Sequence, residues 1–300
     1  QGACMRIAVT GKSGQVVTAL IERGNAAGHD VVALGRPEMD LSAPESIAGV
    51  LEAAAPDVVV SAAAYTAVDK AESEADLAHA INGAGAGAVA RAANTLKVPV
   101  IQVSTDYVFD GALDRPYVET DLTSPTGVYG ASKLAGEQAV LAEHGNDAAI
   151  LRVAWVYSPF GGNFVETMLR LAACRDEVSV VADQVGNPTS ALDIADGILT
   201  VATNLVTSDD PALRGVFHMT ARGETNWAEF AETVFAMAAV VGGPSATVRP
   251  IATVDYPTTA TRPANSRLNC ARIATVHGVT LPEWQSALAN VVSRLYGSRA

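Results

Sequence analysis

Basic residues are few in this 300-residue sequence, and they do not gather into a cluster. Lys and Arg number 20 against 32 Asp and Glu, which gives a formal net charge of −12 at pH 7. A nucleic-acid surface needs clustered Lys and Arg side chains that displace counterions from phosphates. We therefore expect no nucleic acid among the partners. A bound nucleotide remains compatible with this charge, because backbone N–H groups and a few placed cations suffice for its phosphates.

Long apolar runs are also missing. The longest uncharged segment, residues 233–248, contains glycine and proline and is shorter than the roughly 20 residues that a membrane-spanning helix needs. Cysteine is scarce, and Cys174 and Cys270 stand alone without the spacing of a metal site. The sequence therefore predicts a cytoplasmic protein in a reducing environment, with no membrane partner.

The first half of the chain alternates short β-branched runs with alanine-rich helical stretches. The runs predicted as strands are residues 6–10, 30–34, 57–61, 98–103 and 148–153. The helices predicted between them are 15–27, 44–55, 67–97 (as two helices broken near Gly83) and 129–143. Such alternation predicts an α/β fold with a Rossmann-type doubly wound parallel sheet.

The second half is less regular. The elements predicted there are helices at 163–174, 191–206, 227–241 and 281–296 and strands at 178–181 and 216–220. We expect a dinucleotide-binding domain at residues 5–154 and a smaller α/β, mainly substrate-binding domain at 155–300, some of whose segments return to the first. A ligand cleft would then lie between them, beyond the carboxyl ends of the strands.

A glycine-containing turn joins the first predicted strand to the first helix. It reads Gly-Lys-Ser-Gly-Gln from Gly11 to Gln15, and a turn at this place lets a pyrophosphate approach a helix N-terminus. The turn alone is a weak signal, because an ordinary strand–helix turn looks similar and Val17 stands where a third glycine is usual. Its position at the start of the series favours dinucleotide binding at this turn.

The end of the second predicted strand bears on the choice of cofactor. An acidic residue there suits the ribose 2′-hydroxyl of NAD, whereas an arginine suits a 2′-phosphate. This sequence has Arg36, whose guanidinium can meet a phosphate with two hydrogen bonds, and that favours NADPH. A solvent-facing arginine is an equal alternative. Asp40 and Leu41 follow, and we expect them near the adenine.

Tyr129 and Lys133 carry the strongest chemical signal. Their spacing places them on one face of a helix, one turn apart. An ammonium group beside a phenol stabilises the phenolate and lowers the phenol pKa, which suits general acid–base transfer. Such a pair also occurs by chance, as a partly buried tyrosine above a surface lysine. Its place in a chain with a nucleotide turn favours the chemical interpretation.

The loop after the fourth predicted strand supplies hydroxyl groups. It begins Val103-Ser104-Thr105-Asp106, at the expected ligand edge of the sheet. A hydroxyl there can hydrogen-bond the carbonyl oxygen that Tyr129 protonates. Capping of a turn is the alternative role for Ser104, Thr105 and Asp106.

With these motifs in family order, the chain resembles the extended short-chain dehydrogenases/reductases, and among them the reductases of dTDP-linked 4-keto sugars. The resemblance spans nearly the whole chain. The segments that carry it are GKSGQV at 11–16, AAAYTAVDKAE at 62–72, STDYVFDG at 104–111, YGASKLAGE at 129–137, QVGNPTSALDIA at 184–195 and RPANSRL at 262–268. The valine at position 17 departs from the glycine that is common there.

The resemblance implies NADPH or NADH as the hydride donor and a dTDP-sugar as the substrate. The C4 ketone of dTDP-4-dehydro-6-deoxy-L-mannose would be reduced to give dTDP-L-rhamnose. Tyr129 would donate the proton, assisted by Lys133 and Thr105, and the sugar nucleotide would contact Thr105, Asp106 and Trp155. The residues implied for the cofactor are Gly11, Ser13, Gly14, Gln15, Arg36, Asp40, Leu41, Ala62, Ala63, Ala64, Val103, Tyr129 and Lys133.

Several alternatives remain open at this stage. A nucleotide-sugar epimerase or 4,6-dehydratase shares the fold but recycles its NAD, and a dehydratase commonly has Asp-Glu where this chain has Asp106-Tyr107. A regulatory subunit would bind NADP without turnover, which the Tyr129 and Lys133 pair argues against. Trp155 could pack the core between the two domains instead of a sugar. Some relatives form homodimers around a structural Mg²⁺; this sequence does not support the metal and leaves a homodimer open.

Overall fold

A parallel β-sheet forms the centre of the computed structural model, which describes residues 4–296. Its six strands run in the order β10-β5-β4-β3-β1-β2, and every neighbouring pair is parallel. The strands are β1 (Arg6–Thr10), β2 (Asp30–Leu34), β3 (Val58–Ser61), β4 (Val100–Thr105), β5 (Ala148–Val153) and β10 (Gly215–His218). The strand order reverses beside β1, as in a Rossmann-type doubly wound sheet. The predicted fold class is therefore confirmed.

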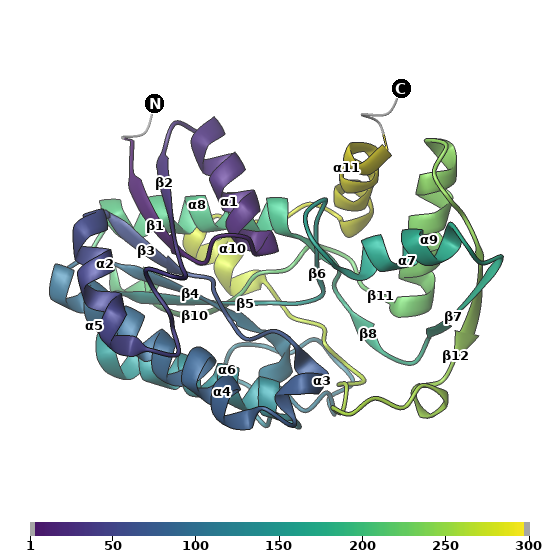
Figure 1. Ribbon diagram of the computed structural model, residues 1–300, viewed down its shortest axis with the longest axis horizontal. Helices are drawn as coiled ribbons and strands as arrows, with labels where there is room; N and C mark the ends of the chain where they lie inside the picture. The colour runs from purple at the N-terminus through teal and green to yellow at the C-terminus, as the bar shows by residue number, and fades with distance from the viewer. Residues whose placement is uncertain (1–3, 297–300) are drawn as a thin grey trace.

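Helices cover both faces of this sheet (Figure 1). One face carries α1 (Gln15–Ala26), α8 (Ala191–Thr207) and α10 (Ala271–His277), and the other carries α2 (Ile47–Ala54), α5 (Ala86–Leu96) and α6 (Val128–His144). β3 is therefore buried on both sides, which explains its Val-Val-Val-Ser sequence. Full burial of each such valine contributes about 1.5–3 kcal/mol relative to exposure.

The helical stretch predicted at residues 67–97 breaks at a different place in the structure. α3 (Val68–Ala71) ends before residues 72–74, and α4 (Ala75–His79) continues through a π-helical turn, η2 (Ala80–Gly85), into α5. The predicted break near Gly83 is therefore wrong. Glycine is tolerated inside this helix because the packing is close: a Cβ at Gly85 would lie 2.5 Å from the carbonyl oxygen of Leu41.

Other predicted elements are present with shifted ends. The helix predicted at 44–55 divides into a 3₁₀ turn, η1 (Pro44–Ser46), followed by α2. β4 continues to Thr105 instead of ending at Val103, because it stays paired with β5 up to that residue. Thr105 is thus the last residue of a strand, and a strand holds its position more firmly than a loop would.

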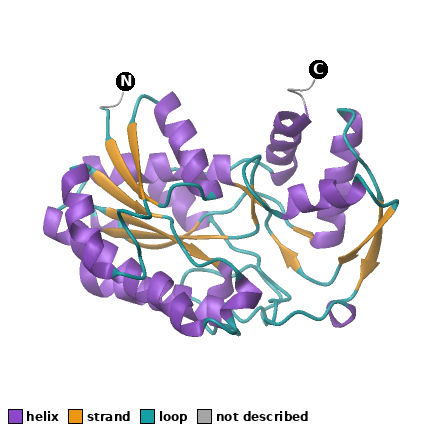
Figure 2. Cartoon of the chain, viewed as in Figure 1, coloured by secondary structure: helices purple, strands orange, loops and turns teal. Residues whose placement is uncertain are grey.

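The second half of the chain builds a smaller group of helices and strands beside the sheet (Figure 2). Its main elements are α7 (Phe164–Ala172), β7 (Glu177–Val181), α9 (Trp227–Val240), β12 (Thr247–Ile251) and α11 (Trp284–Tyr296), which enclose a core of their own. β12 is not predicted by the sequence pattern, because Pro250 interrupts it; its parallel pairing with β7 makes it a strand. No helix within residues 4–296 combines the length and apolarity needed to cross a membrane.

Short elements complete the chain. The two-residue strands are β6 (Val156–Tyr157), β8 (Val185–Gly186), β9 (Thr189–Ser190) and β11 (Thr225–Asn226), which pair as β6 with β9 and β8 with β11. The remaining 3₁₀ turns are η3 (Asp106–Val108), η4 (Gly145–Asp147), η5 (Pro211–Leu213) and η6 (Thr253–Asp255). The predicted second domain extends to residue 300, and its residues 297–300 lie outside the described chain.

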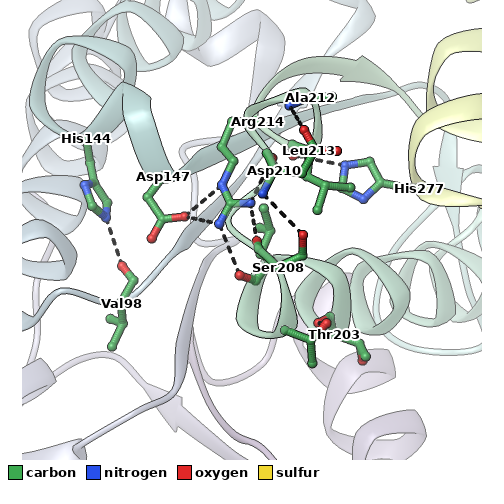
Figure 3. A network of polar contacts seen from close by, with 12 residues as sticks. Val98, His144, Asp147, Thr203, Ser208, Asp210, Ala212, Leu213, Arg214 and His277 are labelled. Atoms are coloured by element: carbon green, nitrogen blue, oxygen red, sulfur yellow. Dashed lines mark hydrogen bonds and ion pairs between the residues drawn. The ribbon is translucent and has the colours of Figure 1, made fainter.

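Arg214 holds the returning strand β10 at the edge of the central sheet (Figure 3). Its Nε and Nη2 donate to Asp147 Oδ1 at 3.0 and 2.7 Å, just before β5 begins. The same guanidinium donates to the carbonyl oxygens of Leu205, Ser208 and Asp210 at 3.1, 2.5 and 3.1 Å. One buried cation therefore satisfies carbonyl groups around the end of α8 while it joins β10 to β5.

Arg214→Ala should lower the free energy of unfolding by about 2–4 kcal/mol, because it leaves a carboxylate and several carbonyl groups without their partner. Urea unfolding followed by circular dichroism measures the loss. Asp147→Asn is the matched control: it keeps an amide oxygen as acceptor and should be less destabilising. An Arg214→Ala protein that unfolds at the wild-type urea concentration would show that β10 does not depend on this contact.

Candidate active site

The residues predicted to bind a cofactor follow the carboxyl ends of three neighbouring strands. Gly11 and Gly14 follow β1, Arg36 and Asp40 follow β2, and alanines 62–64 follow β3. Because these strands are adjacent and parallel, all their carboxyl ends meet at one edge of the sheet. The crevice outside this edge, where the strand order reverses, is the usual ligand position in such sheets.

The first turn leaves the N-terminus of α1 free for an anion. Gly11 has a φ of +102°, which favours glycine, and its N–H donates to the carbonyl oxygen of Leu34 at 2.6 Å. Gly14 is the N-cap of α1 and gives the helix no side-chain hydrogen bond, and a Cβ there would meet only Val17, at 3.8 Å. Ser13 is exposed beside it. These uncapped N–H groups and the open space around them fit the pyrophosphate of a dinucleotide.

Val17 and Gln15 shape the same turn from within the helix. Val17 is 2% exposed, and its Cγ2 lies 3.2 Å from where a Cβ of Gly11 would stand. The valine thus fills the space beneath the turn and joins the core between α1 and α8. Gln15 Oε1 accepts a hydrogen bond from Ser158 Oγ at 2.7 Å, which ties the turn to the segment after β6.

Arg36 and Asp40 carry the charge at the end of β2. Arg36 is exposed, Asp40 is half-buried, and Leu41 is buried in the core beneath them. Hydrogen bonds from Ser42 lower the pKa of the Asp40 carboxyl, and the charge of Arg36 lowers it further. The structure therefore presents an exposed guanidinium beside an ionised carboxylate where the adenosine end of a dinucleotide is expected.

The loop after β3 has a small-residue wall held by one threonine. Thr10 Oγ1 accepts hydrogen bonds from the backbone N–H groups of Ala62 and Ala63, at 3.0 and 2.9 Å. Ala62, Ala63 and Ala64 are all half-buried, so this part of the sheet edge carries only small methyl side chains. Thr10 is the last residue of β1, so this bond also links the ends of two adjacent strands.

Lys12, inside the glycine turn, and Asn82 belong to this edge too, although the sequence pattern indicated no role for either residue. Lys12 pairs with Glu38 across the opening at 2.5 Å. Asn82 accepts from the N–H of Tyr65 at 2.7 Å and donates to the Tyr65 carbonyl at 3.0 Å and to Ser132 Oγ at 2.9 Å. Asn82 therefore ties the loop after β3 to α6. The available signal was a polar residue in an alanine-rich helix, which does not identify its partners.

Tyr129 lies at the start of α6 and faces the end of β4. Its ring packs edge-on against Tyr107, with ring centroids 5.5 Å apart and planes at 75°. The helix comes this close because Gly130 has no side chain: a Cβ there would lie 2.1 Å from the Tyr107 carbonyl oxygen. Burial raises the pKa of Tyr129 to about 12, a hydrogen bond with Thr105 lowers it, and the charge of Asp106 raises it. The phenol therefore keeps its proton at neutral pH.

Lys133 lies one turn further along α6 and points into the interior. Its Nζ donates to the carbonyl oxygen of Val103 at 2.7 Å, and the residue is only 4% exposed. Burial lowers the pKa of Lys133 to about 8, and the charge of Glu137 opposes this shift. The interaction that lowers the pKa of Tyr129 is the hydrogen bond with Thr105, and not the Lys133 charge that the spacing alone suggests.

Ser104 and Thr105 have different roles although they are neighbours. Ser104 Oγ donates to Glu137 Oε1 at 2.5 Å inside the protein. Glu137 also receives two hydrogen bonds from Arg152, at 2.9 and 2.6 Å. The Ser104 hydroxyl is therefore bound to Glu137 inside the protein, and the Thr105 hydroxyl is the one that faces Tyr129.

Asp106 is a buried acid beside this hydroxyl. It is 3% exposed, and its Oδ1 accepts a hydrogen bond from Thr105 Oγ1 at 3.1 Å. Thr105 Oγ1 also accepts from the N–H of Tyr107 at 3.2 Å, so it caps η3 as well as facing the site. Burial raises the pKa of Asp106 to about 6, while hydrogen bonding by Ser266 and Thr105 lowers it. Ser266 brings the C-terminal segment 262–268 to the site.

Trp155 follows the end of β5, at the same edge of the sheet. Its φ of +47° lies in the left-handed region, a strain of about 1–3 kcal/mol for a residue with a side chain. The indole is half-buried and stacks on Trp227, with ring centroids 3.5 Å apart and planes at 9°. It also packs against the apolar cluster beside the β4 loop, which includes Phe109 and Tyr117. Trp155 thus borders both the candidate site and the core.

An open nucleotide turn and a Tyr–Lys pair, placed at one edge of a doubly wound sheet, define an oxidoreductase of the extended short-chain type. A Thr–Asp pair at the end of β4 adds a hydroxyl and an acid next to the proton donor. Within residues 4–296, no group of three or more His, Cys, Asp or Glu side chains is arranged to hold a metal ion.

The comparisons with known proteins identify the family. The family described as RmlD substrate binding domain matches residues 5–296. A dTDP-4-dehydrorhamnose reductase of Sinorhizobium fredii is 49% identical over 96% of this chain and 97% of its own length. The chain belongs to the RmlD family, and it is an NAD(P)H-dependent oxidoreductase like its relatives.

Solved structures of relatives agree with this assignment. A dTDP-4-dehydrorhamnose reductase of Clostridium acetobutylicum, 34% identical, superposes with a TM-score of 0.89 over 96% of this chain and 99% of that chain. The Bacillus anthracis dTDP-4-dehydrorhamnose reductase, solved in complex with NADP, is also 34% identical, with a TM-score of 0.89 over 97% and 100%. The resemblance inferred from the motifs is thus confirmed.

Asp106→Asn should remove a pH dependence from the stability of the fold. The carboxyl has its ordinary pKa of 3.8 in the unfolded chain and about 6 in the folded protein. The folded state therefore binds the proton more tightly, and wild-type stability falls as the pH rises between these values. The contribution of Asp106 to this fall is about 2–3 kcal/mol.

Urea unfolding of both proteins at intervals between about pH 4 and pH 8 tests this. The stability of the wild type minus that of the variant should fall by about 2–3 kcal/mol over the range and level off above about pH 7. Asp193, whose pKa burial also raises to about 6, titrates in both proteins and cancels from the difference. Parallel stability curves would mean that Asp106 is not desolvated.

Proposed function

We propose that this protein reduces the C4 ketone of dTDP-4-dehydro-6-deoxy-L-mannose to the hydroxyl of dTDP-L-rhamnose, with NADPH or NADH. The observation that carries the proposal is the meeting of Tyr129, Thr105 and Asp106 at the edge that also presents the nucleotide turn. The 49% identity to a dTDP-4-dehydrorhamnose reductase over nearly the full length supports the choice of substrate.

Tyr129 is the proton donor in this proposal. A nicotinamide cofactor held at this edge would supply the hydride for the ketone carbon, and the ketone oxygen needs one proton to become a hydroxyl. A phenol with a pKa of about 12 is fully protonated at neutral pH, so the proton is in place when charge develops on that oxygen. The Thr105 hydroxyl, which donates to Asp106 before the transfer, stabilises the phenolate that remains by turning its proton to the phenolate oxygen.

Lys133 assists the proposed reduction from a buried position. Its ammonium group is anchored on the Val103 carbonyl, so it is positioned without mobility beside the cofactor cleft. A pKa of about 8 leaves Lys133 mostly charged at neutral pH, and in this proposal its ammonium group holds the nicotinamide ribose. Val103 thereby contributes to the cofactor site through its backbone.

The cofactor and the sugar nucleotide occupy adjacent parts of the edge. We assign the cofactor phosphates to the turn of Gly11, Ser13, Gly14 and Gln15, the adenosine to Arg36, Asp40 and Leu41, and the wall of the cleft to Ala62, Ala63 and Ala64. The sugar nucleotide contacts Thr105, Asp106 and Trp155. The contact of Ser266 with Asp106 supports a substrate site built partly by the second half of the chain.

The chain divides, in this proposal, into a dinucleotide-binding domain at 5–154 and a mainly substrate-binding domain at 155–300. A core built of second-half residues alone supports the division. The strand β10 and the helices α8 and α10 support the return of second-half segments to the first domain, because they pack on the central sheet.

The alternative functions differ from the proposed reductase in how they use the cofactor. These alternatives are an epimerase, a dehydratase and a regulatory subunit. The first two regenerate their NAD in each cycle, and a regulatory subunit turns over nothing. The proposed reductase consumes one NADPH for each keto sugar reduced. The decrease in absorbance of NADPH with the dTDP-4-keto sugar, compared with the amount of dTDP-L-rhamnose formed, separates the three; no stoichiometric consumption would reject the reductase.

Tyr129→Phe should lower kcat by about two orders of magnitude or more, the usual contribution of a general acid. The substitution removes only the phenol oxygen, so NADPH binding and the melting temperature should stay close to those of the wild type. Steady-state kinetics with the keto sugar and fluorescence titration with NADPH measure both. A variant that retains most of its activity would remove Tyr129 from the role of proton donor.

Arg36→Ala should weaken NADPH binding selectively. If the exposed guanidinium meets the 2′-phosphate, its loss costs about 1–3 kcal/mol, roughly a tenfold to hundredfold rise in the Kd of NADPH. The Kd of NADH, which has no 2′-phosphate, should hardly change. Equal changes for the two cofactors, or none, would mean that Arg36 faces solvent in the complex as well.

A further inference from the structure

The stacked pair of Trp155 and Trp227 joins two apolar clusters. Trp155 packs against the small cluster beside the β4 loop, which includes Phe109 and Tyr117. Trp227 opens α9 and packs against the core that α7, α9 and α11 enclose. The two indoles are nearly parallel, with ring centroids 3.5 Å apart and planes at 9°. The stack is therefore a direct contact between the candidate site and the core of the second half.

Neighbouring residues of the second half of the chain hold Trp227 in place. The ring of Phe164, at the start of α7, lies 4.5 Å from it between centroids. The N-cap residue Asn226 precedes it and accepts a hydrogen bond from the N–H of Glu229 at 2.9 Å, which fixes the first turn of α9. Trp227 thus gives Trp155 a rigid aromatic surface to lie on.

Gly186 closes the space on another side of Trp155. A Cβ at Gly186 would lie 2.4, 2.7 and 2.8 Å from Cε2, Nε1 and Cζ2 of the indole, so the Trp155 ring rests directly on this backbone. Gly186 pairs with Thr225 in the ladder of β8 and β11, and β11 leads at once into Trp227. One short ladder therefore contains Gly186 and leads directly into Trp227, and these two residues together form a slot for the indole.

The backbone of Trp155 gives a reason for such a slot. Its φ of +47° is a conformation that residues with side chains rarely adopt, and it turns the chain from β5 into β6. A strained residue keeps one position only where its surroundings hold it. The slot holds the ring, and the carbonyl oxygen of Trp155 accepts a hydrogen bond from the N–H of Thr189 at 3.1 Å.

We propose that Gly186 and Trp227 are positioning residues for the keto sugar: they hold the Trp155 indole in the orientation in which it receives the deoxysugar ring. The inference rests on the proposed function, because that function assigns Trp155 to the sugar nucleotide. Neither positioning residue contacts the substrate in this arrangement. Trp155 is half-buried, so the part of the indole that the stack, Gly186 and the apolar cluster leave uncovered can receive an apolar sugar face.

Steady-state kinetics of four variants test the slot. Trp227→Leu removes the aromatic surface, and Gly186→Ala places a methyl group where the indole rests. Each should raise the KM of the keto sugar by about three- to tenfold, the effect of one aromatic pair, and leave kcat and the Kd of NADPH unchanged. Trp227→Phe keeps a stacking ring and should restore a KM close to that of the wild type.

Trp284→Phe is the control for simple damage to the second core. Trp284 is 4% exposed and packs edge-on against Phe230 in the same core, with centroids 5.5 Å apart, and it is outside the slot. It should lower the melting temperature and leave the KM unchanged. A wild-type KM in Trp227→Leu, or an equal rise in Trp284→Phe, would overturn the inference.

A binding measurement separates the slot from the proposed reaction. The chain has three tryptophans, so protein labelled with 5-fluorotryptophan gives three ¹⁹F resonances, assigned by replacing each with phenylalanine. The Trp155 resonance should move when dTDP-L-rhamnose is added to the wild type. In Trp227→Leu and Gly186→Ala it should be displaced before any ligand is added, and the Kd should rise by the same factor as the KM.

Two outcomes of this titration have distinct meanings. If the Trp155 resonance responds to dTDP-L-rhamnose but the wild type oxidises no NADPH with the keto sugar, the proposed reaction is wrong and the slot stands. If the wild type turns over the keto sugar but saturating dTDP-L-rhamnose leaves the Trp155 resonance unmoved, the reaction stands and the slot is overturned as a substrate device.

Discussion

Glu137 and Arg152 are almost entirely buried, with side chains 3% and 5% exposed, and their ion pair ties α6 to the centre of the sheet. Arg152 donates two hydrogen bonds to Glu137 and Ser104 donates a third, so one carboxylate joins α6, β5 and β4. Removing one partner from such a pair typically destabilises a protein by about 3–5 kcal/mol. Lys133 and Tyr129 lie one and two turns earlier on α6. The ion pair therefore fixes the position of α6 along the sheet, and with it the position of both residues beside the end of β4.

Burial by the same packing determines the protonation of the site. Loss of hydration raises the pKa of Tyr129 to about 12, lowers that of Lys133 to about 8 and raises that of Asp106 to about 6. Hydrogen bonding by Thr105 and the charge of Glu137 partly oppose these shifts. A buried phenol, an anchored ammonium group and a buried acid are thereby kept within one small region at different proton affinities. Neighbouring groups whose pKa values differ in this way can take different acid–base roles.

Local spacing predicts most of the elements, but contacts between distant segments determine where they end. β4 reaches Thr105 because it stays paired with β5, and the helix passes through Gly83 because the π turn and the close approach of Gly85 to Leu41 permit it. β12 has no recognisable strand pattern around Pro250 and exists through its pairing with β7. Propensity is a weak preference that such contacts override.

The sequence by itself determined the alternating architecture, the glycine turn before α1 and the placement of Tyr129 and Lys133 on one helical face, because these depend on residue type and short-range geometry. Only the tertiary structure decided what these groups touch. Lys133 is anchored on the Val103 carbonyl, and Trp155 lies on Trp227, a residue far along the chain. A hydrogen bond, a stack or a pKa shift depends on distance and burial between segments whose separation in sequence carries no record of their separation in space.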